Sequence, residues 1–254
     1  MQRVCLLGCG NIAGIIASHR QELVDIVACH DTDETRMFAY AGRVDALPCP
    51  TIDNLLECRC PLMVEAASVQ AVRDHLLPAL EAGKDVVVLS VGALTDAVFQ
   101  QEVRAAASRK GRRVYIPSGA VFGLDNIKTA RVADMTELLL RTTKAPGALG
   151  MPDDSPRQRV FAGKASEAVK LFPKNINVSA ALGLAAGQEP DVEIWADPAI
   201  TSNRHEIEAR GTFGSVSIRT DNLPSPENPA TSYLAALSVL TLLKNLGDPI
   251  SVGT

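Results

Sequence analysis

The sequence lacks a basic excess and a long hydrophobic run. Its 25 Lys and Arg residues against 29 Asp and Glu residues give a formal net charge of −4, whereas a protein that binds nucleic acid usually shows a basic excess or patch. No apolar run reaches the roughly 18 residues that span a bilayer. The opening segment MQRVCLLGCGN is too short and too interrupted by glycine for a signal peptide. We therefore expect a cytoplasmic protein with no nucleic-acid or membrane partner.

Paired cysteine motifs are also missing. The six cysteines form no dense framework of the kind seen in small disulfide-rich domains, and none belongs to a Cys-x-x-Cys pair. Cys58 and Cys60 are two positions apart without a second Cys or His pair nearby. We therefore expect no structural zinc site, no other metal, and reduced thiols that pack as small apolar side chains.

The composition, 46% hydrophobic and 21% charged, is that of a folded protein, and 254 residues suffice for one large or two modest domains. Over the first 118 residues, short apolar runs alternate with helical patterns. Strands are predicted over 3–7, 24–30, 62–66, 86–91 and 114–116. Strands that alternate with helices indicate a Rossmann-type, doubly wound parallel sheet in an α/β fold.

The pattern changes after Pro117. Residues 137–144, 192–196, 205–210 and 215–219 read as strands, and the segment 211–214 is a hairpin turn between the last two. This predicts a second, α+β domain with a mostly antiparallel sheet. Asn228 and Pro229 resemble the cap and first position of a final helix. We expect residues 1–118 and 229–254 to form the dinucleotide-binding domain and 119–228 the substrate, catalytic and dimerisation domain.

The strongest chemical signal is a glycine loop between the first predicted strand and helix. Gly8 permits a tight turn, Gly10 lets the backbone approach a pyrophosphate, and Ala13 allows close packing of helix on strand. The helix N-terminus adds N–H donors for the phosphates. Asp31, 21 positions after Gly10, ends the second strand, where a carboxylate binds an adenosine ribose. The alternative is a tight turn that binds nothing.

Asp31 also bears on the choice of cofactor. A carboxylate there repels a 2′-phosphate, and the next residue is Thr32 rather than Arg. NAD is therefore favoured, with NADP kept as an alternative because Arg36 follows closely.

Among the four histidines, His205 is the candidate for acid–base chemistry. It begins an alternating strand and shares a face with Ile207 and Ala209, while Glu206 and Glu208 point the other way. An imidazole on an apolar face next to a loop can act as a general acid or base. The alternative is a histidine that only packs in the core.

Taken together, several stretches resemble the L-aspartate dehydrogenase family, which is similar in build to dihydrodipicolinate reductase. They cover essentially the whole chain in order: Gly8-Cys9-Gly10-Asn11-Ile12, Glu65-Ala66-Ala67-Ser68, Pro117-Ser118-Gly119-Ala120, Gly123-Leu124-Asp125, Phe172-Pro173-Lys174-Asn175-Ile176-Asn177-Val178, Ala196-Asp197-Pro198, Asn203-Arg204-His205-Glu206-Ile207 and Asn228-Pro229-Ala230-Thr231-Ser232. One departure is the segment Ala145-Pro146-Gly147-Ala148-Leu149, which looks like a variant of a double-proline segment of the family.

The resemblance implies NAD(P)-dependent oxidation of L-aspartate to iminoaspartate, which enters NAD biosynthesis or hydrolyses to oxaloacetate and ammonia. It implies a homodimer formed through the second domain and puts the active-site histidine at His205. Together with the glycine loop, it gives these expected cofactor-binding residues: Gly8, Gly10, Asn11, Ile12, Asp31, Ala66, Ser68, Ala120 and Asn175.

The sequence does not choose among the candidate residues for substrate binding. The two carboxylates of aspartate need cationic or N–H partners, for which Lys128, Lys174 and Arg204 are candidates, with Asn177 as an amide group. Three other functions stay open at this stage: a related reductase, a homoserine dehydrogenase, and a non-catalytic NAD-sensing protein.

Overall fold

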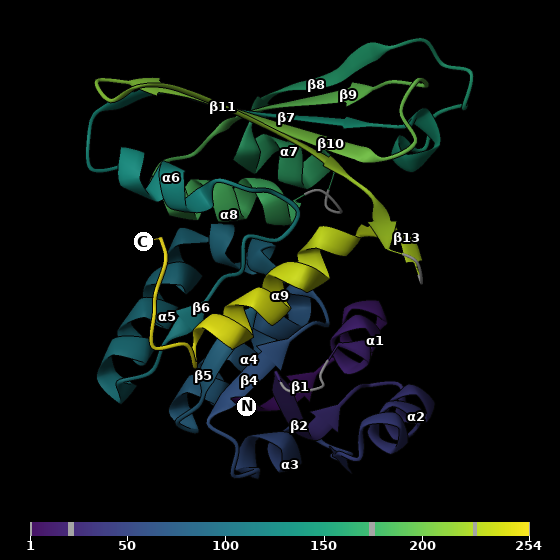
Figure 1. Ribbon diagram of the computed structural model, residues 1–254, viewed down its shortest axis with the longest axis vertical. Coiled ribbons are helices and arrows are strands. Elements are labelled where there is room, and N and C mark those ends of the chain that lie inside the picture. Colours follow the sequence, from purple (N-terminus) through teal and green to yellow (C-terminus); the bar gives the residue numbers. More distant parts are fainter. Residues whose placement is uncertain (1, 20–22, 173–175, 226–227, 254) are drawn as a thin grey trace. The chain divides into compact units, whose positions relative to one another are not determined.

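The computed structural model describes residues 2–19, 23–172, 176–225 and 228–253 (Figure 1). The chain divides into two compact units. Unit 1 comprises Met1–Pro117 and Ala236–Ser251, and unit 2 comprises Ser118–Ala235 and Val252–Thr254. The first boundary lies one residue before the predicted one, whereas the return to unit 1 comes seven residues later than predicted.

Unit 1 is built on a six-stranded parallel sheet. Its strands are β1 (Gln2–Leu7), β2 (Val24–His30), β3 (Leu47–Pro48), β4 (Leu62–Glu65), β5 (Asp85–Val88) and β6 (Val114–Tyr115). They lie in the order β3-β2-β1-β4-β5-β6. The order reverses direction between β1 and β4, and an open α/β sheet binds ligands at such a switch point.

The connecting segments are mostly helical: α1 (Asn11–Ser18), α2 (Glu34–Val44), α3 (Ile52–Glu57), α4 (Val69–Glu81), the 3₁₀ turn η1 (Val91–Thr95) and α5 (Ala97–Lys110). Local sequence explains several ends. The side chains of Asp33, Thr51, Ser68 and Asp96 accept hydrogen bonds from N–H groups in the first turns of α2, α3, α4 and α5. Gly111 ends α5 in the left-handed conformation that glycine adopts without steric cost.

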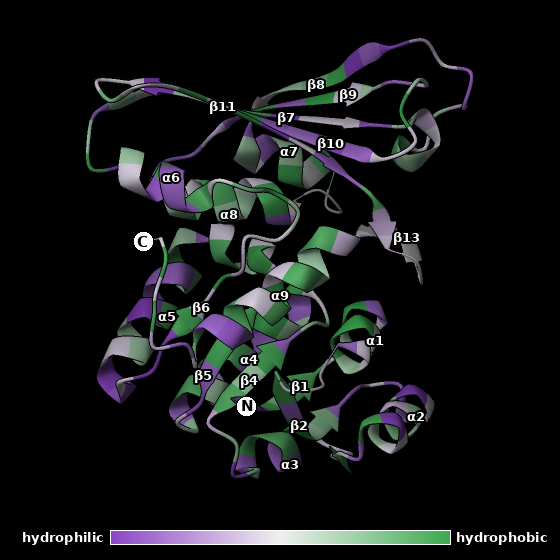
Figure 2. Ribbon diagram, viewed as in Figure 1, coloured by the Kyte–Doolittle hydropathy of each residue, from purple (hydrophilic) through white to green (hydrophobic). Residues whose placement is uncertain are grey.

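The hydrophobic core of unit 1 includes residues of the last helix of the chain. Val4, Leu6 and Val64 of the sheet pack in one buried cluster with residues of α1 and α2 and with Val239 and Leu243 of α9 (Tyr233–Asn245). Figure 2 shows hydrophobic colour along β4 and β5, as expected for strands covered on both faces. The doubly wound parallel sheet predicted from the sequence is thus confirmed.

Unit 2 contains a five-stranded mixed sheet in the order β11-β10-β7-β9-β8. The strands are β7 (Met135–Lys144), β8 (Gln158–Lys164), β9 (Asp191–Ala196), β10 (Asn203–Gly211) and β11 (Gly214–Asn222). Every pair is antiparallel except β7 with β9. The predicted hairpin turn connects β10 to β11.

One face of this sheet is covered by helices. Leu138, Leu140 and Ile207 share a buried cluster with Ala168 of α7 (Ala165–Leu171) and Leu182 of α8 (Ile176–Ala186). Ile127 of α6 (Leu124–Ala130) belongs to the same cluster. A short 3₁₀ turn, η2 (Pro146–Leu149), follows β7.

The prediction for the segment before α9 was wrong. Residues Asn228–Ser232 form the strand β13, which pairs with β12 (Pro224–Ser225), and the helix begins only at Tyr233. Pairing with an upstream strand supplied backbone hydrogen bonds that a cap motif read in isolation does not reveal. In unit 2, β8 occupies a stretch for which no strand was predicted.

Candidate active site

Unit 1 holds a pocket of about 270 Å³ at the switch point of its sheet. Three strand ends meet there: Gly8 and Gly10 follow β1, Asp31 follows β2, and Ala66 and Ser68 follow β4. Five predicted cofactor-binding residues, separated by up to 60 positions, therefore line one cavity.

The two glycines contribute in different ways. Gly8 has φ +95°, and a Cβ there would lie 2.7 Å from the carbonyl oxygen of Ala66. A Cβ on Gly10 would meet no heavy atom within 4 Å. The turn thus requires glycine at position 8, while position 10 leaves open space in front of the start of α1. This space and the N–H groups of α1 fit a dinucleotide pyrophosphate.

The carboxylate of Asp31 is buried at the edge of this pocket. Its Oδ2 accepts a hydrogen bond from the backbone N–H of Cys9 at 2.8 Å, and its Oδ1 accepts one from Asp33 at 2.9 Å. The guanidinium of Arg36 lies 3.5 Å from Oδ2 and also lines the pocket. A carboxylate has about four acceptor positions, so Asp31 can still accept ribose hydroxyls.

Glu65 fixes the loop that follows β4. Its side chain is 1% exposed. Oε1 accepts from the backbone of Ala67 and the hydroxyl of Ser90, both at 2.8 Å, and Oε2 accepts from the backbone of Leu89 and Ser90 at 3.1 and 3.0 Å. Burial raises the pKa of Glu65, and these hydrogen bonds oppose the shift. Glu65 thus joins the ends of β4 and β5 beneath the pocket.

Other residues of this region show the limits of the sequence reasoning. Asn11 and Ile12 begin α1 directly after the loop and are half-buried, but they do not contribute to the pocket lining. His30 and His75, which the sequence did not single out, do contribute. The Nδ1 atom of His30 lies 2.7 Å from the carbonyl oxygen of Cys49, so this nitrogen carries the proton.

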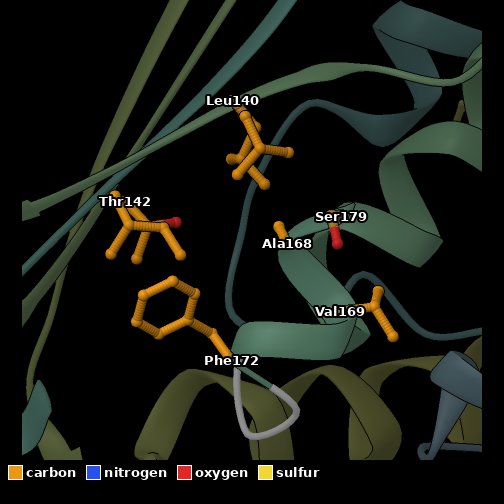
Figure 3. Close-up of a pocket in the computed structure, with 8 residues that line it drawn as sticks. Leu140, Thr142, Ala168, Val169, Phe172 and Ser179 are labelled. Carbon is orange, nitrogen blue, oxygen red and sulfur yellow. The ribbon is translucent and has the colours of Figure 1, made fainter. Parts of the chain in front are cut away.

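In unit 2, His205 lies on the helix-covered face of the sheet with Ile207 and Ala209, as alternation predicted. It is paired with Thr142 on β7 and with Thr220 on β11. The hydroxyl of Thr142 lies 3.0 Å from its Nδ1 atom. Figure 3 shows the ring of Phe172 beside Thr142 in a small cavity of about 10 Å³, which Ser179 also lines.

Burial lowers the pKa of His205 to about 4, with a smaller contribution in the same direction from the positive charge of Lys144. The imidazole is therefore neutral at physiological pH. A neutral imidazole with one nitrogen engaged by a hydroxyl can accept a proton at the other nitrogen.

Ala120 precedes α6 in unit 2. Its carbonyl oxygen accepts a hydrogen bond of 2.8 Å from the Nδ2 of Asn222, whose Oδ1 in turn accepts one from Ser232. Asn222 and Ser232 also line a pocket of about 90 Å³ at the end of β7.

The predicted substrate residues are not gathered around His205. Arg204 lies on the opposite face of β10, where its Nε bonds to Asp221 at 2.6 Å. Lys128 and Asn177 are exposed, on α6 and in the first turn of α8. Lys174 and Asn175 lie outside the described residues. Sequence reasoning missed Thr142 and Lys144, because only the pairing of β7 with β10 brings them to the histidine.

No group of three or more His, Cys, Asp or Glu side chains within the described part of the chain is arranged to hold a metal ion. Within the same ranges, no helix has both the length and the apolar character needed to cross a membrane.

Comparison with protein families gives two matches. The family model "Aspartate dehydrogenase, C-terminal" matches residues 125–246, and "Homoserine dehydrogenase, NAD binding domain" matches residues 8–117. The second match agrees with the fold and pocket of unit 1 and indicates a pyridine-nucleotide cofactor.

The chain is also similar to curated proteins over its whole length. The chain is 47% identical to an L-aspartate dehydrogenase of Methanospirillum hungatei, with complete coverage of both proteins. It is 42% identical to one of Methanothermobacter thermautotrophicus, covering all of this chain and 99% of the relative.

Solved structures show the same relationship. Aspartate dehydrogenase from Thermotoga maritima superposes with a TM-score of 0.85 at 27% identity, with both chains fully covered. GenD2 from gentamicin A biosynthesis, solved in complex with NAD, shares the fold at 14% identity and a TM-score of 0.56, over 99% of this chain and 88% of its own. Because relatives match from end to end at well above 30% identity, the chain belongs to the L-aspartate dehydrogenase family.

Proposed function

We propose that this protein is an NAD(P)-dependent L-aspartate dehydrogenase, which converts L-aspartate to iminoaspartate. The imine then hydrolyses to oxaloacetate and ammonia or feeds NAD biosynthesis. The observation that carries the proposal is the neutral, buried imidazole of His205 bonded to Thr142, in a chain that matches aspartate dehydrogenases over its whole length.

The reaction needs a base. Free aspartate carries an ammonium group at neutral pH, and its nitrogen must lose a proton before an imine can form at Cα. His205 accepts this proton, or orders a water molecule that accepts it. When bound, the nicotinamide supplies the acceptor for the hydride that leaves Cα.

Thr142 determines which imidazole nitrogen is available. Because Nδ1 lies 3.0 Å from the threonine hydroxyl, Nε2 is the nitrogen that exchanges the proton with the substrate. A hydroxyl both donates and accepts, so the contact with Thr142 can persist when the imidazole changes its protonation state.

NAD is the preferred cofactor, with NADP accepted less well. Asp31 at the edge of the pocket favours ribose hydroxyls over a 2′-phosphate. Arg36, 52% exposed and 3.5 Å from Asp31, is a cation that a 2′-phosphate could recruit. Gly8, Gly10, Asn11, Ile12, Ala66 and Ser68 complete the binding region in unit 1, and Ala120 and Asn175 are the positions proposed in unit 2.

For the substrate, Asn177 and Lys174 stay in the proposal as an amide and a cation. Arg204 leaves it, because its guanidinium is paired with Asp221 on the face away from His205. We further propose a cytoplasmic homodimer formed through unit 2. The six free thiols support the location, and the face of the sheet opposite α7 and α8 offers an area for self-association, with Arg141 and Glu193 at its centre.

The test is a spectrophotometric assay at 340 nm with NAD or NADP and a panel of amino acids. We expect turnover with L-aspartate and little with the other amino acids. Nucleotide binding without turnover of any amine would instead indicate a non-catalytic nucleotide-sensing protein. Light scattering after gel filtration measures the oligomeric state, and a monomer would contradict the dimer.

A further inference from the structure

His30, the last residue of β2, is one of the buried polar residues of unit 1, and it is 8% exposed. Its Nδ1 atom lies 2.7 Å from the carbonyl oxygen of Cys49. A carbonyl oxygen only accepts hydrogen bonds, so Nδ1 carries the proton, and in a neutral imidazole the other nitrogen is then an acceptor. The contact with Cys49 thus leaves Nε2 of His30 as a hydrogen-bond acceptor.

This acceptor is open to the pocket at the switch point of the sheet. His30 lines that pocket of about 270 Å³ together with its neighbour Asp31. Nε2 makes no hydrogen bond with the described residues, and it does not belong to the side-chain atoms in that part of the chain that are enclosed without a partner. A mostly buried imidazole therefore presents an acceptor to the cavity.

His30 points to the face of the sheet that carries α3 and α4. Its neighbour Cys29 packs in the buried cluster that contains residues of α1 and α2. Side chains alternate along a strand, so His30 points to the other face. On that face Cys49 leads into α3, which packs against β2 and α4. The imidazole and α4 therefore border the same part of the pocket.

Helix α4 offers a surface for a flat ring. Ala71 and His75 both line the pocket, and residues four positions apart lie on the same face of a helix. Ala71 has a short side chain, and His75 adds a half-buried aromatic ring. Nucleic-acid bases stack on aromatic side chains. This face of α4 therefore suits the purine ring of a nucleotide.

Asp31 identifies the part of the dinucleotide that belongs here, because an acidic residue at this position binds the adenosine ribose. Each of its carboxylate oxygens accepts one backbone N–H, from Cys9 or Asp33. About two acceptor positions are left for the ribose hydroxyls. The adenine base itself has one hydrogen-bond donor, its 6-amino group. With the hydroxyls bound by Asp31, the donor that remains for His30 is this amino group.

We propose that Nε2 of His30 accepts a hydrogen bond from the 6-amino group of the adenine and thereby selects adenine over hypoxanthine in the bound dinucleotide. This proposal rests on the cofactor site proposed above. Hypoxanthine carries a carbonyl oxygen where adenine carries the amino group, so two acceptors would face each other and the hydrogen bond would be lost. His30 thus determines specificity for the base, whereas Asp31 binds the ribose.

The experiment measures dissociation constants by calorimetric titration, which requires no turnover. The ligands are NAD, nicotinamide hypoxanthine dinucleotide, and an NAD analogue that lacks the 2′-hydroxyl of the adenosine ribose. We expect the unmodified protein to bind NAD about 10- to 100-fold more tightly than the hypoxanthine dinucleotide, because the latter leaves a buried acceptor without a donor.

Two substitutions separate the recognition of the base from the contact with Cys49. His30→Asn keeps an amide N–H near the position of Nδ1 and removes the acceptor at Nε2, so the preference for NAD over the hypoxanthine dinucleotide should disappear. His30→Gln places an amide oxygen near the position of Nε2 and should keep part of the preference. The matched control is His19→Asn, because Nδ1 of His19 also contacts a backbone carbonyl but the residue lies outside the pocket. It should behave as the unmodified protein.

Equal affinities of the unmodified protein for NAD and the hypoxanthine dinucleotide would overturn the proposal, as would an undiminished preference in His30→Asn. If His30→Asn weakens both dinucleotides equally but leaves the 2′-deoxy analogue unaffected, His30 binds the ribose and the proposal is wrong. If NAD binds with the expected preference but no amine is oxidised, the proposed function fails and the role of His30 is retained. If neither dinucleotide binds, both proposals fail. Should His30→Asn not fold, His30→Met serves in the same measurements.

Discussion

The pocket of unit 1 and the surroundings of His205 in unit 2 are built from different parts of the chain. In unit 1, the shape comes from backbone: a left-handed turn at Gly8, the open space at Gly10, and a loop that Glu65 holds through three N–H groups and a hydroxyl. In unit 2, the proposed chemistry depends on two separate side chains, His205 and Thr142, carried by two paired strands.

The two regions should therefore respond differently to substitution. A pocket shaped by backbone tolerates changes in lining side chains but depends on glycines and on buried anchors. A site made of separate side chains on a regular sheet should lose chemistry while keeping its fold.

The largest effect is expected for His205→Asn, which keeps a polar side chain but cannot accept the proton. General-base catalysis contributes about 10²–10⁴-fold, so kcat/KM should fall by this factor. The fall corresponds to a loss of about 3–5 kcal/mol of transition-state stabilisation. NAD affinity should not change. His19→Asn, at the end of α1, is the matched control. A near-normal kcat in His205→Asn, with only a lower melting temperature, would show that His205 packs in the core and takes no part in catalysis.

Glu65→Ala should damage unit 1 through its fold. The change leaves the buried hydroxyl and N–H group of Ser90 and two partly buried N–H groups without their acceptor, and the loss of one partner from such a network costs about 3 kcal/mol or more. Denaturant unfolding measures the free energy, and nucleotide titration should show weaker binding. Glu81→Ala, on the exposed end of α4, is the control. Unchanged stability of Glu65→Ala would show that the loop does not need this anchor.

His205 should also make stability depend on pH. Its pKa is lowered from 6.5 to about 4 in the folded protein, so the unfolded chain binds more protons between these values. The neutral, buried His205 therefore contributes about 3 kcal/mol to the free energy of unfolding above pH 6.5, and this contribution is lost as the pH falls toward 4. Unfolding curves of the unmodified protein and His205→Asn at several pH values measure this contribution of His205 to stability. Parallel pH dependences of the two proteins would contradict burial of a neutral imidazole.

Asp31→Ala tests the one side chain on which the unit 1 pocket relies for specificity. Loss of hydrogen bonds to a charged acceptor should weaken NAD binding by about 1.5–3 kcal/mol. Discrimination against NADP should fall, because Arg36 no longer has this carboxylate beside it. The ratio of kcat/KM for the two cofactors measures the effect. Asp33→Ala, which removes another carboxylate paired with Arg36, is the control, and an unchanged ratio in Asp31→Ala would place the ribose elsewhere.

The sequence predicted local features well because their causes are local. The glycine loop and the hairpin between β10 and β11 depend on residues a few positions apart. The last helix was placed too early because the motif at Asn228 and Pro229 competes with strand pairing to residues 224 and 225. A capping signal gives no information about such a partner.

By itself, the sequence determined the class of unit 1, the position of its glycine turn, and the alternation that puts His205 on an apolar face. Each follows from the periodicity of strands and the conformational freedom of glycine, which are properties of short segments. Only the tertiary structure decided which groups surround His205. Thr142 is 63 positions away, and it becomes the neighbour of the imidazole through the register of β7 with β10. That register also gives Lys144 its place on the face of His205 and leaves Arg204 on the other, because a shift of one residue would exchange the two faces.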